Sequence, residues 1–196
     1  IAERALRLTA LDYLRFAKPE KAADIALSLL EKSDNLTDRL GALRTLGAVG
    51  GKRAEVAFEA FYNRFADEPL VVNQWFQIQA MNPYGDALAR VKALLSHPAY
   101  DSLNPNKIRS VVGAFCSANP VRFHVESGEG YALLADVVID LNKKNPQIAA
   151  RLLAPLTKWR NYPNYAQRMK VELERIAAQD NLSKDVFEVV SKSLAV

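Results

Sequence analysis

Apolar residues recur with a helical period along the whole chain, and this pattern constrains the fold more than any other feature. In several segments the residues at i, i+3, i+4 and i+7 are apolar, which places each set on one face of a helix. Four such sets are Ala23, Ala26, Leu27 and Leu30; Phe58, Phe61, Tyr62 and Phe65; Ile108, Val111, Val112 and Phe115; and Tyr131, Leu134, Ala135 and Val138. Sustained alternation of apolar and polar residues, the pattern of a half-buried strand, does not occur. The sequence therefore predicts an all-α protein.

Asparagine, proline and glycine divide this pattern into segments. Asn-Pro pairs begin at Asn82, Asn104, Asn119 and Asn145. Asn caps helices, and Pro is well suited to the first helical turn, so such pairs favour helix starts. The clearest start is Asn145, and Pro155 should kink or stop the helix that follows. Gly128 and Gly130 indicate a shaped loop in the break over 117–130.

The segments indicate about eleven helices, mostly of ~10–17 residues, joined by short turns. Helices connected in this way pack antiparallel to their neighbours. We therefore expect antiparallel helix pairs stacked in a solenoid-like superhelix of the ARM/HEAT type. Because no strict sequence repeat is visible, a compact irregular helical bundle is the alternative.

The charge pattern argues against a nucleic-acid partner. The 26 basic residues are interleaved with 22 acidic ones, giving a net charge of +4, and no run of five Lys or Arg occurs. A nucleic-acid-binding protein needs a clustered basic face. No stretch approaches the ~20 consecutive apolar residues of a membrane span. Since Cys116 is the only cysteine, no internal disulfide can form, and we expect a reducing, cytoplasmic location.

A search for catalytic groups finds no catalytic residue and no metal site. The two histidines, His97 and His124, are isolated from each other, whereas a catalytic zinc needs three protein ligands. Cys116 follows an apolar stripe and fits a buried, inert thiol. Asp136 and Asp140 share a helix face that fits a solvent-exposed surface. The aromatic residues Trp75, Phe76 and Trp159 fit a core or an interface better than a ligand site.

One segment carries a family resemblance. The stretch from Asn104 to Phe115 (NPNKIRSVVGAF) is similar to a segment near the C-terminus of bacterial aminopeptidase N, a zinc-dependent M1-family peptidase. The similarity continues through Asn119-Pro120, Phe123-His124, Gly128, Gly130-Tyr131, Asn145-Pro146-Gln147, Arg151-Leu152 and Pro155. Order and spacing agree over about fifty positions, and the helical period agrees over the whole chain. Ser127 departs from the pattern, which more often has Asp before the glycine.

The resemblance implies that residues 1–196 form a single C-terminal α-helical domain of a larger multidomain peptidase. That enzyme would be a metalloaminopeptidase, which removes N-terminal residues from peptides. Its zinc would be bound outside this chain, by a catalytic domain that contacts this one. The domain itself would be non-catalytic, closing the active-site cavity and helping to position short peptide substrates.

The resemblance also assigns two candidate residues of the substrate cavity, Arg109 and Arg151. Both flank a buried stripe in the sequence pattern, and a guanidinium there can offer two parallel donors to a peptide carboxylate or carbonyl. The structural alternative is that each arginine forms an interhelical salt bridge or clamps a helix carbonyl.

A second class of function is a free-standing helical-repeat scaffold that binds a partner protein. The chain begins at Ile1 rather than Met, and an amphipathic pattern is already present at Ala2. Both features favour a domain of a longer protein over a free-standing scaffold.

Overall fold

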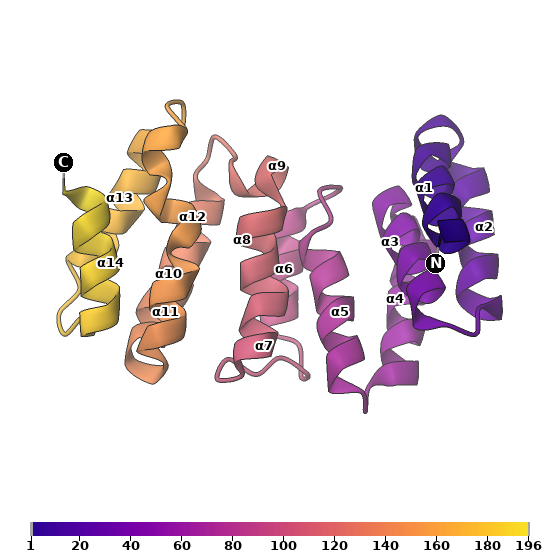
Figure 1. Ribbon diagram of the computed structural model, residues 1–196, viewed down its shortest axis with the longest axis horizontal. Coiled ribbons are helices and arrows are strands. Elements are labelled where there is room, and N and C mark those ends of the chain that lie inside the picture. Colours follow the sequence, from indigo (N-terminus) through magenta and orange to yellow (C-terminus); the bar gives the residue numbers. More distant parts are fainter. Residues whose placement is uncertain (1, 196) are drawn as a thin grey trace. The chain divides into compact units, whose positions relative to one another are not determined.

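The structure, a computed structural model, describes residues 2–195, which form helices, turns and loops but no strand (Figure 1). It divides into two compact units, one ending at Tyr100 and the other beginning at Asp101. None of the helices within 2–195 is both long and apolar enough to cross a membrane.

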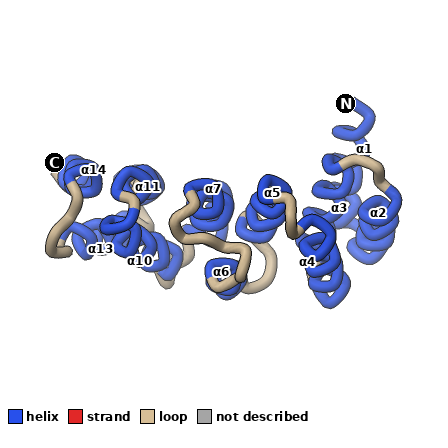
Figure 2. The backbone as a smooth tube through the Cα atoms, turned by 90° about the horizontal axis from the view of Figure 1, so that it is seen from below, coloured by secondary structure: helices blue, strands red, loops and turns tan. Residues whose placement is uncertain are grey.

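The first unit contains six helices in two layers. They are α1 (Ala2–Ala17), α2 (Pro19–Lys32), α3 (Leu36–Val49), α4 (Gly51–Phe65), α5 (Pro69–Ala80) and α6 (Ala87–Leu95). Each helix packs against the next one in the chain, and α3 also contacts α1 and α5. Helices α1, α3 and α5 thus form one layer, and α2, α4 and α6 form the other (Figure 2).

The second unit begins with a helix that contains an irregular turn. The helix consists of α7 (Pro105–Ile108), a π-helical turn (Arg109–Gly113) and α8 (Ala114–Ala118) without interruption. It is followed by α9 (Pro120–Phe123), α10 (Glu129–Lys144), α11 (Pro146–Leu152), α12 (Ala154–Thr157), a 3₁₀ turn (Trp159–Asn161), α13 (Ala166–Ala177) and α14 (Lys184–Leu194). Helix α10 packs against α11 and α13, and α14 packs against the same two helices.

The expected fold class is confirmed: the described chain is all-α, and within each unit consecutive helices pack against one another. If Pro105–Ala118 is counted as one helix, eleven helices in 2–195 have seven residues or more, as the sequence predicts. The expectation of a single domain over 1–196 stays a prediction.

The periodic apolar stripes form the core of each unit. In the second unit Ile108, Val111, Val112 and Phe115 are all 0% exposed. Burying each of these side chains contributes about 1.5–3 kcal/mol relative to leaving it in water. Packing of the stripe therefore holds the Pro105–Ala118 helix in place, and this helix carries Arg109.

The Asn-Pro pairs differ in what they do. The Oδ1 of Asn104 accepts a hydrogen bond from the Asn106 N–H at 2.9 Å, and Asn145 accepts one from the Ile148 N–H at 3.3 Å. Asn119 also precedes a helix. Asn82 does not start a helix, because its side chain serves a distant contact, donating from Nδ2 to the Gly47 carbonyl at 2.6 Å.

The loop before α10 has the shape that its glycines predict. Gly128 has φ +75°, a left-handed conformation, and precedes the first residue of α10. A Cβ on Gly130 would lie 2.6 Å from the carbonyl oxygen of Phe123, so only glycine fits there without a shift. The break also contains the short helix α9, which starts directly after Asn119.

Candidate functional site

The structure places Arg109 and Arg151 on the wall of one cavity in the second unit. We call this cavity of about 210 Å³ the arginine pocket. It is lined by Arg109, Gly113, Cys116, Ser117, Ile148, Arg151, Leu152, Ala154 and Pro155. The two arginines come from separate helices, and both side chains are exposed.

One wall of the arginine pocket comes from the end of α11. The Asn145 cap starts this helix, and Pro146 occupies its first position. As expected, the helix ends before Pro155, because Pro155 has no N–H to donate to the carbonyl four residues earlier. Helix α11 stops at Leu152, and the chain turns into α12. The turn brings Ala154 and Pro155 to the pocket rim beside Arg151.

The other wall is the π-helical turn from Arg109 to Gly113. Turns of this type are rare and occur mostly as single insertions in α-helices, frequently at functional sites. A Cβ added to Gly113 would lie 3.7 Å from the Arg109 Cβ, an ordinary contact. Glycine is therefore not required by sterics at this position, but its missing side chain leaves the space beside Arg109 open.

The charge in the arginine pocket is positive and uncompensated. None of its lining residues is acidic. Within the described range 2–195, neither the Arg109 nor the Arg151 guanidinium takes part in an ion pair or a hydrogen bond. The structure thus shows no sign of the salt bridge or carbonyl clamp that was the structural alternative. Two guanidinium groups beside apolar walls can together receive an anionic or strongly polar group.

The Cys116 thiol that lines the arginine pocket is not a reactive nucleophile at neutral pH. Cys116 is buried, as the sequence indicates, and burial raises the pKa of its thiol far above the ordinary value. Such a thiol stays protonated at neutral pH, and the thiolate is the reactive form. The pocket therefore offers two guanidinium groups and apolar walls to a ligand.

The two histidines have separate structural roles. His97 accepts a hydrogen bond at Nδ1 from the Ala99 N–H, at 3.1 Å. The Nδ1 of His124 lies 2.9 Å from the Tyr131 hydroxyl, and its ring stacks on Tyr162 with centroids 4.3 Å apart. In the part of the chain that is described, no group of three His, Cys, Asp or Glu side chains could hold a metal ion. The residues present therefore do not fit a zinc site.

The other polar and aromatic residues considered in the sequence lie on the surface or in the core. Asp140 pairs with Lys144 at 2.7 Å, and Asp136 pairs with Arg175 at 2.8 Å, both on the solvent-exposed surface. Trp75 and Phe76 are buried in the first unit, as expected. Trp159 is half-buried and donates from Nε1 to the Ser193 carbonyl at 3.3 Å.

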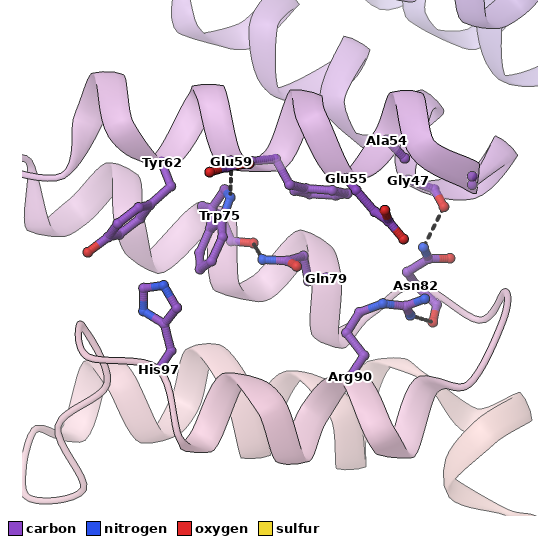
Figure 3. A pocket seen from close by; sticks show the side chains of 13 residues that line it. Gly47, Ala54, Glu55, Glu59, Tyr62, Trp75, Gln79, Asn82, Arg90 and His97 are labelled. Atoms are coloured by element: carbon purple, nitrogen blue, oxygen red, sulfur yellow. Dashed lines mark hydrogen bonds between the residues drawn. The ribbon is translucent and has the colours of Figure 1, made fainter.

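A second cavity, in the first unit, was not expected from the sequence. We call this cavity of about 400 Å³ the glutamate pocket (Figure 3). Its lining residues are Gly47, Gly50, Gly51, Ala54, Glu55, Phe58, Glu59, Tyr62, Trp75, Gln79, Asn82, Arg90 and His97. The only signal in the sequence is that Glu55, Glu59 and Tyr62 fall at i, i+4 and i+7, on one face of a helix.

Comparisons with known proteins agree with the resemblance. Residues 1–195 match the family described as a domain of unknown function (DUF3458_C) with ARM repeats. The chain is 47% identical to Caulobacter vibrioides aminopeptidase N over 161 residues, covering 82% of this chain and 19% of the relative. It is 36% identical to Escherichia coli aminopeptidase N over 196 residues, covering 100% of this chain and 22% of the relative.

A solved structure gives the same result. The crystal structure of Legionella pneumophila aminopeptidase A in complex with aspartic acid superimposes with a TM-score of 0.92 at 36% identity. The match covers 97% of this chain and 23% of that one. The chain thus spans about a fifth of the length of the relatives it matches. By its match over residues 1–195, the chain belongs to the ARM-repeat family DUF3458_C, the helical domain that these aminopeptidases share.

Proposed function

We propose that this chain is the non-catalytic C-terminal domain of a zinc aminopeptidase, where it closes the active-site cavity and helps to position short peptides. The observation that carries the proposal is the match of 82% and 100% of this chain to about a fifth of two longer proteins named aminopeptidase N. In that enzyme, Arg109 and Arg151 would contact the distal part of a bound peptide.

The arginine pocket supplies the chemistry for that contact. A peptide presents carbonyl oxygens along its backbone and a carboxylate at its end, and guanidinium groups can bind both with paired hydrogen bonds. The Arg109 and Arg151 guanidinium groups make no competing bond within the part of the protein that the structure covers. They are therefore available for a ligand without first losing an internal partner.

Peptide cleavage would take place in another part of the enzyme. A bound zinc in such an enzyme activates water for attack on the peptide bond. The described residues 2–195 do not fit a zinc site, so in this proposal the metal ligands would come from outside them. The contribution of this chain would be to restrict access and to orient the peptide.

A free-standing scaffold remains the second candidate from the sequence. It gains no support from the comparisons, because the relatives reported above are longer proteins named as aminopeptidases. A cytoplasmic location is consistent with the single cysteine, Cys116, which is buried and unpaired.

The test compares substrates of different length on the full-length protein. Arg109→Ala and Arg151→Ala should leave turnover of a single-residue chromogenic substrate nearly unchanged, because that substrate does not reach the arginine pocket. For tri- and tetrapeptides, loss of a charge-assisted hydrogen bond should cost about 1–3 kcal/mol. This corresponds to a roughly tenfold to hundredfold fall in kcat/KM.

Arg4→Ala is the matched control, since Arg4 is exposed and lies in the other unit. It should affect neither class of substrate. Equal losses for short and long substrates, or no loss for either, would remove the two arginines from the substrate contacts. Absence of any aminopeptidase activity in the full-length wild type would instead overturn the assignment to an aminopeptidase.

A further inference from the structure

Helix α1 packs against α2 and α3 through one of its faces. Leu11, at the centre of this face, is 4% exposed. Leu8 lies so close to Gly41 of α3 that a Cβ at position 41 would clash with its side chain. The guanidinium of Arg7 pairs with the Asp38 carboxylate of α3 at 3.2 Å. These contacts fix which side of α1 is turned towards the first unit.

The opposite side of α1, which we call the outer face, carries no charged residue. At 3.6 residues per turn, the positions farthest around the helix from Leu11 are 2, 5, 6, 9, 13, 16 and 17. They hold Ala2, Ala5, Leu6, Thr9, Tyr13, Phe16 and Ala17, and all of them are exposed. The three large side chains, Leu6, Tyr13 and Phe16, are 71%, 73% and 67% exposed.

This pattern differs from that of an ordinary surface helix. A surface helix has one apolar stripe towards the core and polar or charged residues on the opposite side, whereas a helix that is apolar on both sides is usually buried. Single exposed apolar residues are common, but a contiguous exposed apolar patch marks an interaction surface. The outer face of α1 is therefore a surface that another part of a protein covers.

The last helix, α14, provides a comparison within the same chain. Its exposed side includes Lys184, Asp185, Glu188 and Lys192, and the Lys192 ammonium pairs with the Glu188 carboxylate at 2.6 Å. The exposed aromatic residue of this helix, Phe187, stands beside these charges. Stacked helical repeats need a polar outer side on a terminal repeat. Helix α14 meets this requirement and α1 does not.

The packing order of the first unit indicates what kind of element covers the outer face. Helix α3 is packed between α1 and α5. Within residues 2–195, α1 has no equivalent neighbour over its outer face, because that face is exposed. A further helix with an apolar side would continue the same series.

The length of the relatives indicates where this helix comes from. The chain spans about a fifth of each aminopeptidase N that it matches, so a full-length protein of that kind contains much additional polypeptide. If the chain is the C-terminal domain, as proposed above, that polypeptide precedes residue 1 and is joined directly to α1. A directly joined segment has an effective concentration of about millimolar, far above that of a second copy in solution.

From these observations, we propose that the outer face of α1 binds a helix of the polypeptide that precedes residue 1 in the full-length protein. The apolar side of that helix covers Leu6, Tyr13 and Phe16. Helix α1 is then an internal helix of a longer stack instead of its end. This inference rests on the proposed C-terminal position of the chain but not on peptidase activity.

Photocross-linking of the full-length protein tests the proposal directly. The photoreactive aromatic residue p-benzoylphenylalanine replaces Tyr13, and the irradiated protein is digested and analysed by mass spectrometry. We expect a product with the mass of the monomer, in which position 13 is joined to a residue that precedes residue 1. A product with the mass of a dimer would mean that a second copy covers the face. A cross-link only to residues 2–195, or none, would also overturn the proposal.

Thiol labelling gives a second, independent measurement. In the full-length protein, Tyr13→Cys should react with a maleimide at least about tenfold more slowly in buffer than in denaturant, since a covered site reacts only after local opening. Phe187→Cys is the matched control, because Phe187 is also an exposed aromatic residue of a helix. It should react in buffer nearly as fast as in denaturant. Equally fast reaction of Tyr13→Cys in buffer and in denaturant would show that the outer face is open to water.

An aminopeptidase assay on the same samples separates this inference from the proposed function. The expected cross-link in a protein without aminopeptidase activity would support the inference and overturn the proposed function. An active enzyme in which Tyr13 gives no cross-link to the preceding polypeptide would overturn the inference alone.

Discussion

Arg109 and Arg151 reach the same cavity from two separate helices, and neither guanidinium has a hydrogen-bond or ion-pair partner in the described part of the chain. An arginine that held helices together would be expected to pair with a carboxylate or a carbonyl. A ligand-binding role and a structural role of these arginines predict different effects of their substitution on the stability of the protein.

Replacing either arginine by alanine should leave the stability of the protein nearly unchanged. Surface substitutions that break no specific contact usually change the free energy of unfolding by less than about 0.5 kcal/mol. Arg175→Ala provides the contrast, since Arg175 pairs with Asp136 and Glu172 and donates to the Ala132 carbonyl at 3.2 Å. Denaturant unfolding of the three variants should show a clear loss only for Arg175→Ala. A similar loss of unfolding free energy for Arg109→Ala would indicate that Arg109 has a structural role instead.

Gly130 and Gly113 should respond in opposite directions to alanine. At Gly130 the new Cβ would lie 2.6 Å from a backbone oxygen, which cannot move without shifting α9. We expect Gly130→Ala to destabilise the protein by about 1–3 kcal/mol, the usual range for overpacking. Gly113→Ala meets no clash and sits in a helix, so it should be neutral or stabilise by up to about 1 kcal/mol.

Thermal or denaturant unfolding of both glycine variants checks this pair. The inference about the close approach at Phe123 would be wrong if Gly130→Ala were as stable as the wild type.

His124 should make stability depend on pH below about 6.5, its ordinary pKa. Burial lowers the pKa of His124, and it raises that of the neighbouring Tyr131 to about 12. Both groups are therefore neutral at pH 7, and the Tyr131 hydroxyl lies 2.9 Å from His124 Nδ1. As the pH falls from about 6.5 towards the lowered pKa, the unfolded chain takes up a proton that the folded chain resists. Stability should then decrease in that window.

His124→Asn removes the titrating group while keeping a polar side chain at that position. Unfolding free energies between pH 5 and 7.5 should fall less steeply for this variant than for the wild type. The same slope in both proteins would assign the pH dependence to other groups.

Cys116 should be unreactive while the protein is folded. Cys116 is 5% exposed, and burial raises the pKa of its thiol well above the ordinary range. Alkylation by iodoacetamide at pH 8, followed by mass spectrometry of the peptide that contains Cys116, should be slow in buffer and fast in denaturant. Rapid labelling of the native protein would show that the part of the arginine pocket lined by Cys116 opens to solvent.

Much of this molecule follows from local rules that can be read in the sequence. The stripe of Ile108, Val111, Val112 and Phe115 predicts a buried helix, since 3.6-residue periodicity acts within a single turn and needs no partner to be recognised. The Asn145 cap and the stop before Pro155 follow from backbone hydrogen bonds that neighbouring residues make or lack.

The two pockets could not be predicted from local sequence patterns. Arg109 and Arg151 were candidates through a family resemblance, but only the packing of α11 beside the Pro105–Ala118 helix brings them to one cavity without partners. The Asn82-Pro83 pair predicted a helix start, but the Asn82 side chain donates a hydrogen bond to the distant Gly47 carbonyl. The glutamate pocket joins Glu55, Gln79 and His97 from three separate segments. Contacts between such distant residues depend on how separate helices pack together. They cannot be predicted from the spacing of residues within one helix.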